Sequence, residues 1–128
     1  MNSHKLKVLV VDDDADVRRF LTELLESEGH TVVTASSGLD GILKAKADID
    51  VAILDMMMPV FDGISVCRSL KADPETEHIP VLFLTGYEDE KILKVCSESG
   101  DALLRKPVKC DDLLSKVAEL VSTRLAFA

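Results

Sequence analysis

The chain has 128 residues, of which 47% are hydrophobic and 30% charged, and its formal net charge is −8 at pH 7. This composition is typical of one globular domain and argues against intrinsic disorder and against non-specific binding to nucleic acid or anionic membranes. No apolar run approaches the roughly 20 residues of a transmembrane helix, the N-terminus does not resemble a secretory signal, and the three cysteines are widely spaced. We therefore expect residues 1–128 to form a single cytoplasmic domain with reduced thiols.

The first predicted strand covers residues 6–11, a run rich in β-branched residues that stops at three aspartates. We expect Asp14 or a neighbouring acid to cap the helix that follows, and Gly29 to lie just after its end. The inward face of this helix has apolar residues at helical spacing, namely Val17, Phe20, Leu21, Leu24 and Leu25.

The second predicted strand covers residues 31–35 and precedes a helix for which Ser36 and Ser37 offer an N-cap. We expect this helix to end near Asp48. Its inward face is predicted to carry Leu39, Ile42 and Leu43.

The third predicted strand, residues 51–54, is an uninterrupted apolar run that ends at Asp55. Such a run is typical of a strand in a parallel sheet, because helices cover both of its faces. Pro59 and Gly63 mark the loop after it. The next helix, from about residue 64, is predicted to bury Ile64, Cys67 and Leu70.

The last part of the chain continues the alternation of strands and helices. Residues 81–84 form a fourth buried strand that ends at Thr85, and a helix with Ile92, Val95 and Cys96 on its inner face follows from about Glu88. A short fifth strand covers residues 102–104. Asp111 is expected to cap the last helix, whose apolar side carries Leu113, Leu114, Val117, Leu120 and Val121.

Five apolar strands that alternate with five amphipathic helices predict an α/β fold built on a doubly wound parallel sheet. The carboxyl ends of all the strands in such a sheet lie at one edge, where ligands bind at the topological switch point. The polar residues that follow the predicted strands are therefore expected to form one site: Asp12, Asp13, Asp55, Thr85 and Lys106.

Three carboxylates in one site favour a bound cation, because like charges raise one another's pKa. Mg²⁺, with Mn²⁺ as an alternative ion, suits a site with few carboxylates that retains water and phosphate ligands. Lys106 adds a compact positive charge for a phosphate, and Thr85 adds a hydroxyl donor. An aspartate can itself become an aspartyl phosphate, so this set of groups fits phosphoryl transfer to Asp55.

The chain resembles the receiver domain of two-component response regulators, of the chemotaxis-regulator-like kind, from about Lys5 to Leu120. The segments that carry the resemblance are VVDDD at residues 10–14, ILDMMMP at 53–59 with DG at 62–63, FLTG at 83–86 and RKP at 105–107. The resemblance implies a flavodoxin-like (βα)5 fold with strand order 2-1-3-4-5.

The same resemblance implies a role for each residue of the site. Asp55 would be the phosphoacceptor, and Thr85 and Lys106 would be the family's switch hydroxyl and lysine. Asp13 would bind Mg²⁺ directly and Asp12 largely through water. Asp55 and the backbone carbonyl of Met57 would complete the metal site, and the peptide bond before Pro107 would be cis.

The resemblance also implies the partners of the domain. A sensor histidine kinase or a histidine phosphotransfer protein would dock near the first helix and donate the phosphoryl group, and a downstream effector would receive the signal. The domain would catalyse only its own phosphorylation and dephosphorylation, without contacting nucleic acid or membrane. The output face would consist of the fourth helix, the strand 102–104 and the last helix, and this face also allows a homodimer.

The chain departs from the family pattern in three ways. Leu103 stands where the family usually has an aromatic switch residue, and the segment 100–103 is one residue shorter than the common pattern. Met57 and Tyr87 are bulky residues at positions that influence the access of water to the phosphoryl group, so we expect slow dephosphorylation. No output domain is recognised, which fits either a stand-alone regulator or a receiver from a longer protein.

Three other functions are compatible with the fold class. A flavin or nucleotide binder would need a Gly-rich or Ser/Thr-rich loop after the first strand, where this chain has three aspartates. An aspartate-dependent phosphatase usually has a second acid two residues after its nucleophile, where this chain has Met57. A degenerate receiver that acts as a phosphorylation-independent docking module is the remaining alternative.

Overall fold

The computed structural model describes residues 5–58, 62–86 and 90–126, without the side chains at positions 92, 95–97, 99 and 123–126. Three sequence-based expectations therefore lie outside the described residues: the helix start at Glu88, the shielding role of Tyr87, and the inner face of the fourth helix at Ile92, Val95 and Cys96. Within the described residues, no helix combines the length and the apolar character needed to cross a membrane.

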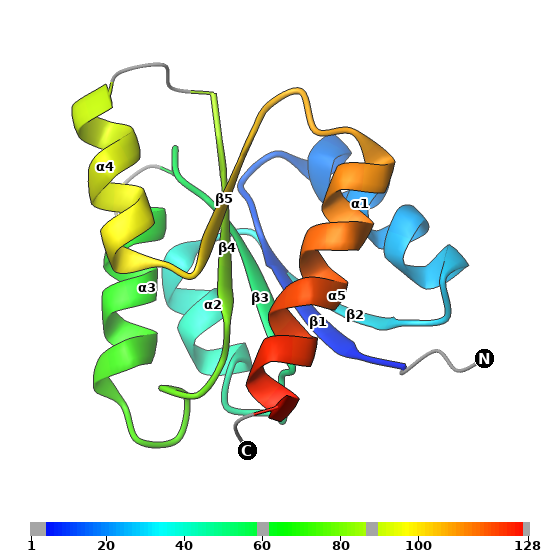
Figure 1. Ribbon diagram of the computed structural model, residues 1–128, viewed down its shortest axis with the longest axis horizontal. Coiled ribbons are helices and arrows are strands. Elements are labelled where there is room, and N and C mark those ends of the chain that lie inside the picture. Colours follow the sequence, from blue (N-terminus) through cyan, green and yellow to red (C-terminus); the bar gives the residue numbers. More distant parts are fainter. Residues whose placement is uncertain (1–4, 59–61, 87–89, 127–128) are drawn as a thin grey trace.

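A five-stranded parallel sheet forms the centre of the molecule (Figure 1). Its strands in chain order are β1 (Lys7–Val11), β2 (Thr31–Ala35), β3 (Val51–Asp55), β4 (Val81–Thr85) and β5 (Ala102–Arg105). The spatial order β2-β1-β3-β4-β5 confirms the predicted doubly wound, flavodoxin-like arrangement. β3 and β4 are buried along their whole length, as their uninterrupted apolar sequences predict.

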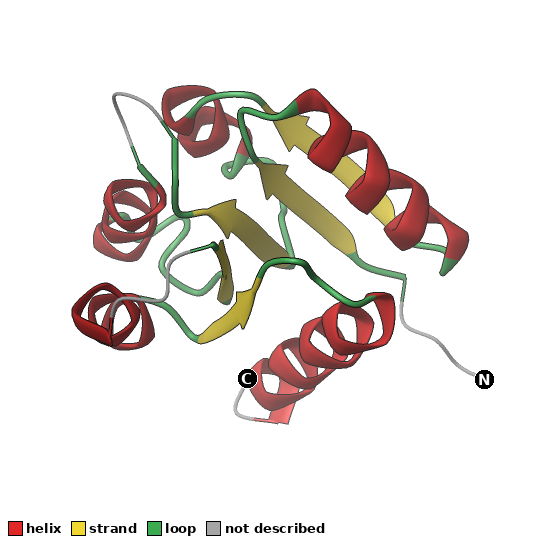
Figure 2. Ribbon diagram, turned by 90° about the horizontal axis from the view of Figure 1, so that it is seen from above, coloured by secondary structure: helices red, strands yellow, loops and turns green. Residues whose placement is uncertain are grey.

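Helices cover both faces of the sheet. They are α1 (Ala15–Ser27), α2 (Gly38–Lys44), α3 (Gly63–Ala72), α4 (Glu90–Ser99) and α5 (Cys110–Ala126). Figures 1 and 2 show α1 and α5 on one face and α2, α3 and α4 on the other. The sheet thus separates two apolar cores, one of which is built around Leu21, Leu25, Leu113 and Val117 and the other around Val66, Leu70 and Phe83.

Side-chain caps begin three of the helices. Asp14 accepts hydrogen bonds from the main-chain N–H groups of Asp16 and Val17, which confirms the predicted cap of α1. Ser37 caps α2 and Asp62 caps α3 in the same way. These caps satisfy N–H groups that have no partner inside the helix.

The predicted start of the last helix is wrong by two residues. α5 begins at Cys110, and its first turn includes a hydrogen bond from Leu113 N to the carbonyl oxygen of Lys109. Asp111 therefore lies inside the first turn instead of capping it. Its negative charge still complements the positive end of the helix dipole.

The predicted inward face of α2 is only partly correct, because Ile42 packs against the core but the two leucines do not. Leu39 and Leu43 are 63% and 69% exposed, whereas Gly41 is buried. A Cβ atom at Gly41 would lie 2.7 Å from Cγ2 of Val11, so α2 approaches β1 too closely for a larger residue at position 41. α2 also ends at Lys44, earlier than predicted.

One residue of α1 departs from its predicted place. Leu21 and Leu25 are buried and Val17 and Leu24 are half-buried, as the helical spacing predicts, but Phe20 is 44% exposed. Phe20 lies at the margin of the inward face, where solvent reaches part of its ring.

Candidate functional site

The loop after β1 supplies two carboxylates of very different exposure. Asp12 is only 1% exposed, whereas Asp13 is exposed. Asp12 N donates to the carbonyl oxygen of Ala35 at 3.1 Å, and Asp14 N donates to Asp12 Oδ1 at 2.9 Å. The guanidinium of Arg18 donates to the carbonyl oxygen of Asp12 at 2.7 Å. Main chain and side chain of Asp12 are therefore both fixed.

Asp55 is the last residue of β3 and is 3% exposed. Its Oδ1 accepts a hydrogen bond from Met57 N at 3.2 Å and another from Lys106 Nζ at 3.2 Å. Gly63, the first residue of α3, packs on its main chain so closely that an added Cβ would lie 2.5 Å from the Asp55 carbonyl oxygen. The end of β3 and the start of α3 are thus in direct contact.

Thr85 is the last residue of β4, and Lys106 directly follows the end of the neighbouring strand β5. Lys106 N donates to the carbonyl oxygen of Thr85 at 2.8 Å, and Lys106 Nζ lies 3.7 Å from Asp12 Oδ2. Thr85 ends β4 and is fully buried. The Lys106–Pro107 peptide bond is cis, as the resemblance implies.

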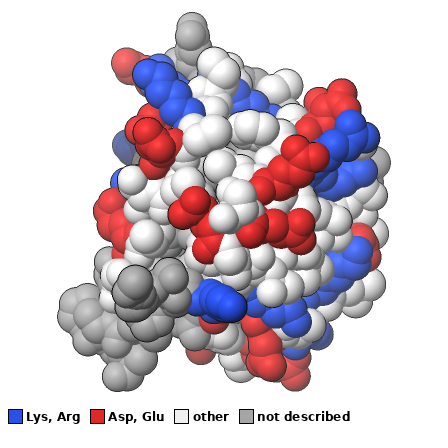
Figure 3. All heavy atoms as spheres, turned by 90° about the vertical axis from the view of Figure 1, so that its right-hand side faces the viewer, with Lys and Arg blue, Asp and Glu red and all other residues white. Residues whose placement is uncertain are grey.

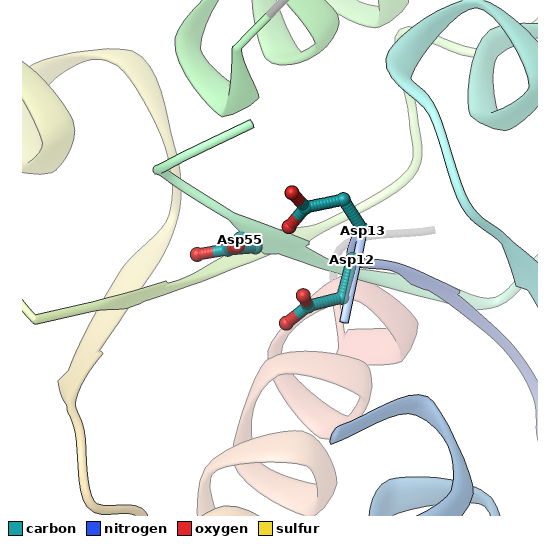
Figure 4. Close-up of side chains that lie close together, drawn as sticks. All are labelled: Asp12, Asp13 and Asp55. Carbon is teal, nitrogen blue, oxygen red and sulfur yellow. The ribbon is translucent and has the colours of Figure 1, made fainter. Parts of the chain in front are cut away.

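The carboxylates of Asp12, Asp13 and Asp55 converge on one space at the carboxyl edge of the sheet (Figure 4). One oxygen from each lies within 4.8 Å of the others. Asp12 Oδ2 is buried and accepts no hydrogen bond from the described residues. An orphaned carboxylate oxygen beside two further carboxylates fits a hard divalent cation such as Mg²⁺, which prefers oxygen ligands.

Burial raises the pKa of Asp12 to about 6, because a buried carboxylate loses the hydration that stabilises its charge. The hydrogen bond from Asp14 N lowers this pKa, and the negative charge of Asp55 raises it. Lys106 lowers it by attraction, and Asp13 raises it by repulsion. A divalent cation would favour the ionised form and oppose the effect of burial.

The structure brings most of the predicted site residues together. One oxygen each of Asp12, Asp13 and Asp55 lies within 4.8 Å of the others, and Lys106 forms ion pairs with Asp12 and Asp55. Thr85 is hydrogen-bonded to Lys106 through the main chain. Sequence reasoning did not find Arg18. An arginine six residues after Asp12 leaves no pattern in the sequence, because its contact is with a main-chain oxygen.

The model of the response regulator receiver domain family matches residues 8–118. The chain is 38% identical over 122 residues to the response regulator PleD of Caulobacter vibrioides, covering 93% of this chain. It is 34% identical to a receiver domain protein of Clostridium thermocellum, with a TM-score of 0.84 and coverage of 96% of this chain and 99% of that one.

A third similar protein shares the fold at lower identity. The receiver domain of the sensor histidine kinase PA1611 of Pseudomonas aeruginosa is 23% identical, with a TM-score of 0.84 and coverage of 93% of this chain and 99% of that one. Its structure holds a magnesium ion coordinated in the active site cleft. The chain spans 27% of the length of PleD and 8% and 13% of two sensor kinases that it also matches.

Proposed function

Since the chain belongs to the response regulator receiver domain family of two-component systems, we propose that Asp55 accepts a phosphoryl group from a phosphohistidine. The contact that carries this proposal is the one between Lys106 Nζ and Asp55 Oδ1, at 3.2 Å, inside a cluster of three converging carboxylates. A nucleophilic carboxylate, an ammonium group and a cation-binding cluster are what phosphoryl transfer requires. We further propose that residues 1–128 form one receiver domain.

The reaction begins with Asp55 attacking the phosphorus atom in line with the departing imidazole nitrogen. An O–P bond forms at Asp55, the P–N bond breaks, and the imidazole leaves with the electron pair. Asp55 Oδ1 already accepts hydrogen bonds from Met57 N and Lys106 Nζ, and no described residue donates to Oδ2. We assign Oδ2 as the attacking oxygen.

The surrounding residues neutralise and orient the transferred group. Lys106 balances charge on the phosphoryl oxygens, and the Thr85 hydroxyl donates to one of them after transfer. Asp12, Asp13, Asp55 and the backbone carbonyl of Met57 are the proposed ligands of Mg²⁺, with Mn²⁺ as a substitute. When bound, the ion supplies positive charge that offsets the charge of the phosphoryl group.

The proposed phosphodonor is a sensor histidine kinase or a histidine phosphotransfer protein that docks on α1, and the receiver of the signal is an effector protein or domain. The α1 and α5 side of the molecule carries interspersed acidic and basic groups, with no continuous basic surface on the described residues (Figure 3). Such a surface supports protein partners over nucleic acid. We propose that the domain catalyses only its own phosphorylation and dephosphorylation.

The proposed acceptor can be tested by mass spectrometry. Wild-type protein incubated with Mg²⁺ and phosphoramidate is expected to gain about 80 Da, the mass of one phosphoryl group, in an acid- and base-labile form. Asp55→Asn should not gain it, and Asp50→Asn, a strand-flanking control distant from the cluster, should gain it normally. An unmodified wild-type protein would contradict the proposal and favour the docking module.

A further inference from the structure

Arg18 connects α1 to the acidic loop. The side chain is half-buried, and its Nη1 donates to the carbonyl oxygen of Asp12 at 2.7 Å. Hydrogen bonds from a charged donor at this distance are among the stronger ones in proteins. The neighbouring Arg19 is different, because its side chain is 70% exposed and approaches only Asp16, at 3.9 Å.

The hydrogen bond from Arg18 holds the carbonyl group of Asp12, which the other hydrogen bonds of this residue do not involve. Asp12 N is held by Ala35 and Asp12 Oδ1 by Asp14 N, whereas the carbonyl group of Asp12 belongs to the peptide that leads to Asp13. Within the described residues, the Asp13 side chain makes no hydrogen bond or ion pair of its own. The direction of the Asp13 carboxylate therefore depends on the orientation of that peptide.

We propose that Arg18 is a positioning residue for the metal site: it fixes the Asp12–Asp13 peptide so that the two carboxylates converge with Asp55. This inference rests on the proposed function, and it assigns a role to a residue that contacts neither the cation nor the phosphoryl group. Groups that orient metal ligands in this way commonly change metal affinity by about 10-fold to 100-fold when they are removed.

The direction of the change in cation affinity distinguishes a positioning role of Arg18 from a purely electrostatic effect of its charge. A guanidinium near a cation site repels the cation, so its removal would tighten binding if charge alone mattered. Loss of positioning has the opposite result, because the Asp13 carboxylate leaves its productive direction. The measurement is Mn²⁺ binding by electron paramagnetic resonance, which needs no phosphorylation.

We expect Arg18→Ala to weaken Mn²⁺ binding about 10-fold. Arg18→Lys, which keeps the charge and a donor, should restore most of the affinity, and the matched control Arg19→Ala should bind as well as wild type or slightly more tightly. If Arg18→Ala does not fold, Arg18→Met is measured in its place, because methionine keeps the apolar part of the side chain. Equal affinities for the Arg18 and Arg19 variants would overturn the proposal.

A second measurement makes no use of metal. Amide order parameters of Asp13 and Asp14 in the metal-free protein should fall in Arg18→Ala and stay unchanged in Arg19→Ala. If wild type itself fails to bind Mn²⁺, the proposed metal site is wrong, and these order parameters alone decide the role of Arg18: a fall supports it and no change overturns it.

Discussion

At the scale of single residues, Asp12 is the most constrained member of the acidic cluster. Its carboxylate is almost fully buried, one oxygen accepts from Asp14 N, and the other lies 3.7 Å from Lys106 Nζ, too far for a hydrogen bond. Burial is therefore the largest of the influences on the Asp12 carboxyl group, and it raises the pKa of Asp12 to about 6. The fold keeps a carboxylate where its ionisation opposes folding, which is expected where the group serves a function.

The raised pKa of Asp12 predicts how stability depends on pH in the absence of metal. The folded protein holds the proton up to about pH 6, whereas the pKa of an unfolded aspartate is near its ordinary value of 3.8. Stability from this group therefore falls as pH rises from about 4 to about 6. Asp12→Asn should remove that fall and raise the unfolding free energy at pH 7 by up to about 3 kcal/mol.

Urea unfolding of both proteins in EDTA, from pH 4.5 to 7.5, measures this difference. Asp13→Asn is the matched control, because Asp13 is exposed and its removal should change the unfolding free energy much less. A difference between wild type and Asp12→Asn that stays constant across this range would contradict the assignment.

Met57 is a second residue with a specific expected effect. Its side chain is 53% exposed and its main-chain N–H donates to Asp55 Oδ1, so its main chain lies beside the carboxylate of Asp55. We propose that the apolar side chain of Met57 hinders the approach of water to the acyl phosphate. Met57→Asn should speed the decay of phospho-Asp55 by up to about 10-fold, equivalent to about 1.4 kcal/mol of activation free energy.

The decay can be followed by the loss of the phosphoryl mass after removal of the phosphodonor. Met57→Leu keeps the bulk of the side chain and should decay like wild type. Equal decay in Met57→Asn and Met57→Leu would mean that Met57 only covers local surface.

At the scale of elements, the strands were predictable and one helix face was not. Buried parallel strands leave uninterrupted apolar runs, so each strand was found to within one residue, and the polar residues after them gave the site. The inward side of α2 is formed around Gly41 because the helix lies against Val11, and apolar periodicity cannot signal a face on which the critical residue has no side chain. The contact of Arg18 could not be predicted either, because it is made with a main-chain oxygen and leaves no pattern in the sequence.

The turn before β5, where the chain is shorter than its family pattern, is fixed by one carboxylate. Asp101 Oδ2 accepts from Val81 N at 2.7 Å and from Lys71 Nζ at 2.9 Å, and Lys71 Nζ also donates to the carbonyl oxygen of Ile79 at 2.9 Å. α3, β4 and β5 are thereby joined at the edge opposite the site. Leu103, in place of the usual aromatic residue, is half-buried against the core that includes Phe83.

The close contact between α3 and β3 predicts that a methyl group added at Gly63 destabilises the fold. In Gly63→Ala, the new Cβ would meet the Asp55 carbonyl oxygen at 2.5 Å, so the main chain of β3 or α3 has to move. The unfolding free energy should fall by about 1–3 kcal/mol, as for other overpacked sites. Phosphorylation of Asp55 should slow as well, since its carboxylate moves with the main chain.

The matched control for this change is Gly86→Ala. No heavy atom lies within 4 Å of a Cβ built at Gly86, so this variant should unfold at close to the wild-type urea concentration. Equal unfolding midpoints for the two variants would show that α3 adapts to the extra methyl group without strain.

At the scale of the whole molecule, the site connects the two cores. Asp55 ends β3, whose side chains belong alternately to the core under α1 and α5 and to the core under α2 and α3. A cation bound at the carboxyl edge therefore stabilises the fold as a unit, by an amount set by its concentration relative to the dissociation constant.

We expect Mg²⁺ to raise the free energy of unfolding by about 1.4 kcal/mol when its concentration is ten times the dissociation constant. Calorimetry in EDTA and in increasing Mg²⁺ measures the shift of the melting temperature. Asp13→Asn removes one ligand and should abolish most of the shift, whereas Asp16→Asn, an exposed acid on α1, should leave it unchanged. An equal shift in both variants would place the ion elsewhere.

Lys106 affects how tightly a divalent cation can bind beside these carboxylates. Its ammonium group lies 3.2 Å from Asp55 Oδ1 and 3.7 Å from Asp12 Oδ2, so the carboxylates carry their own covalently tethered counter-ion. A chain with a neutral residue at position 106 would hold a divalent ion more tightly, because that repulsion would be gone. We therefore propose that Lys106 keeps a bound divalent ion exchangeable with the ions in solution.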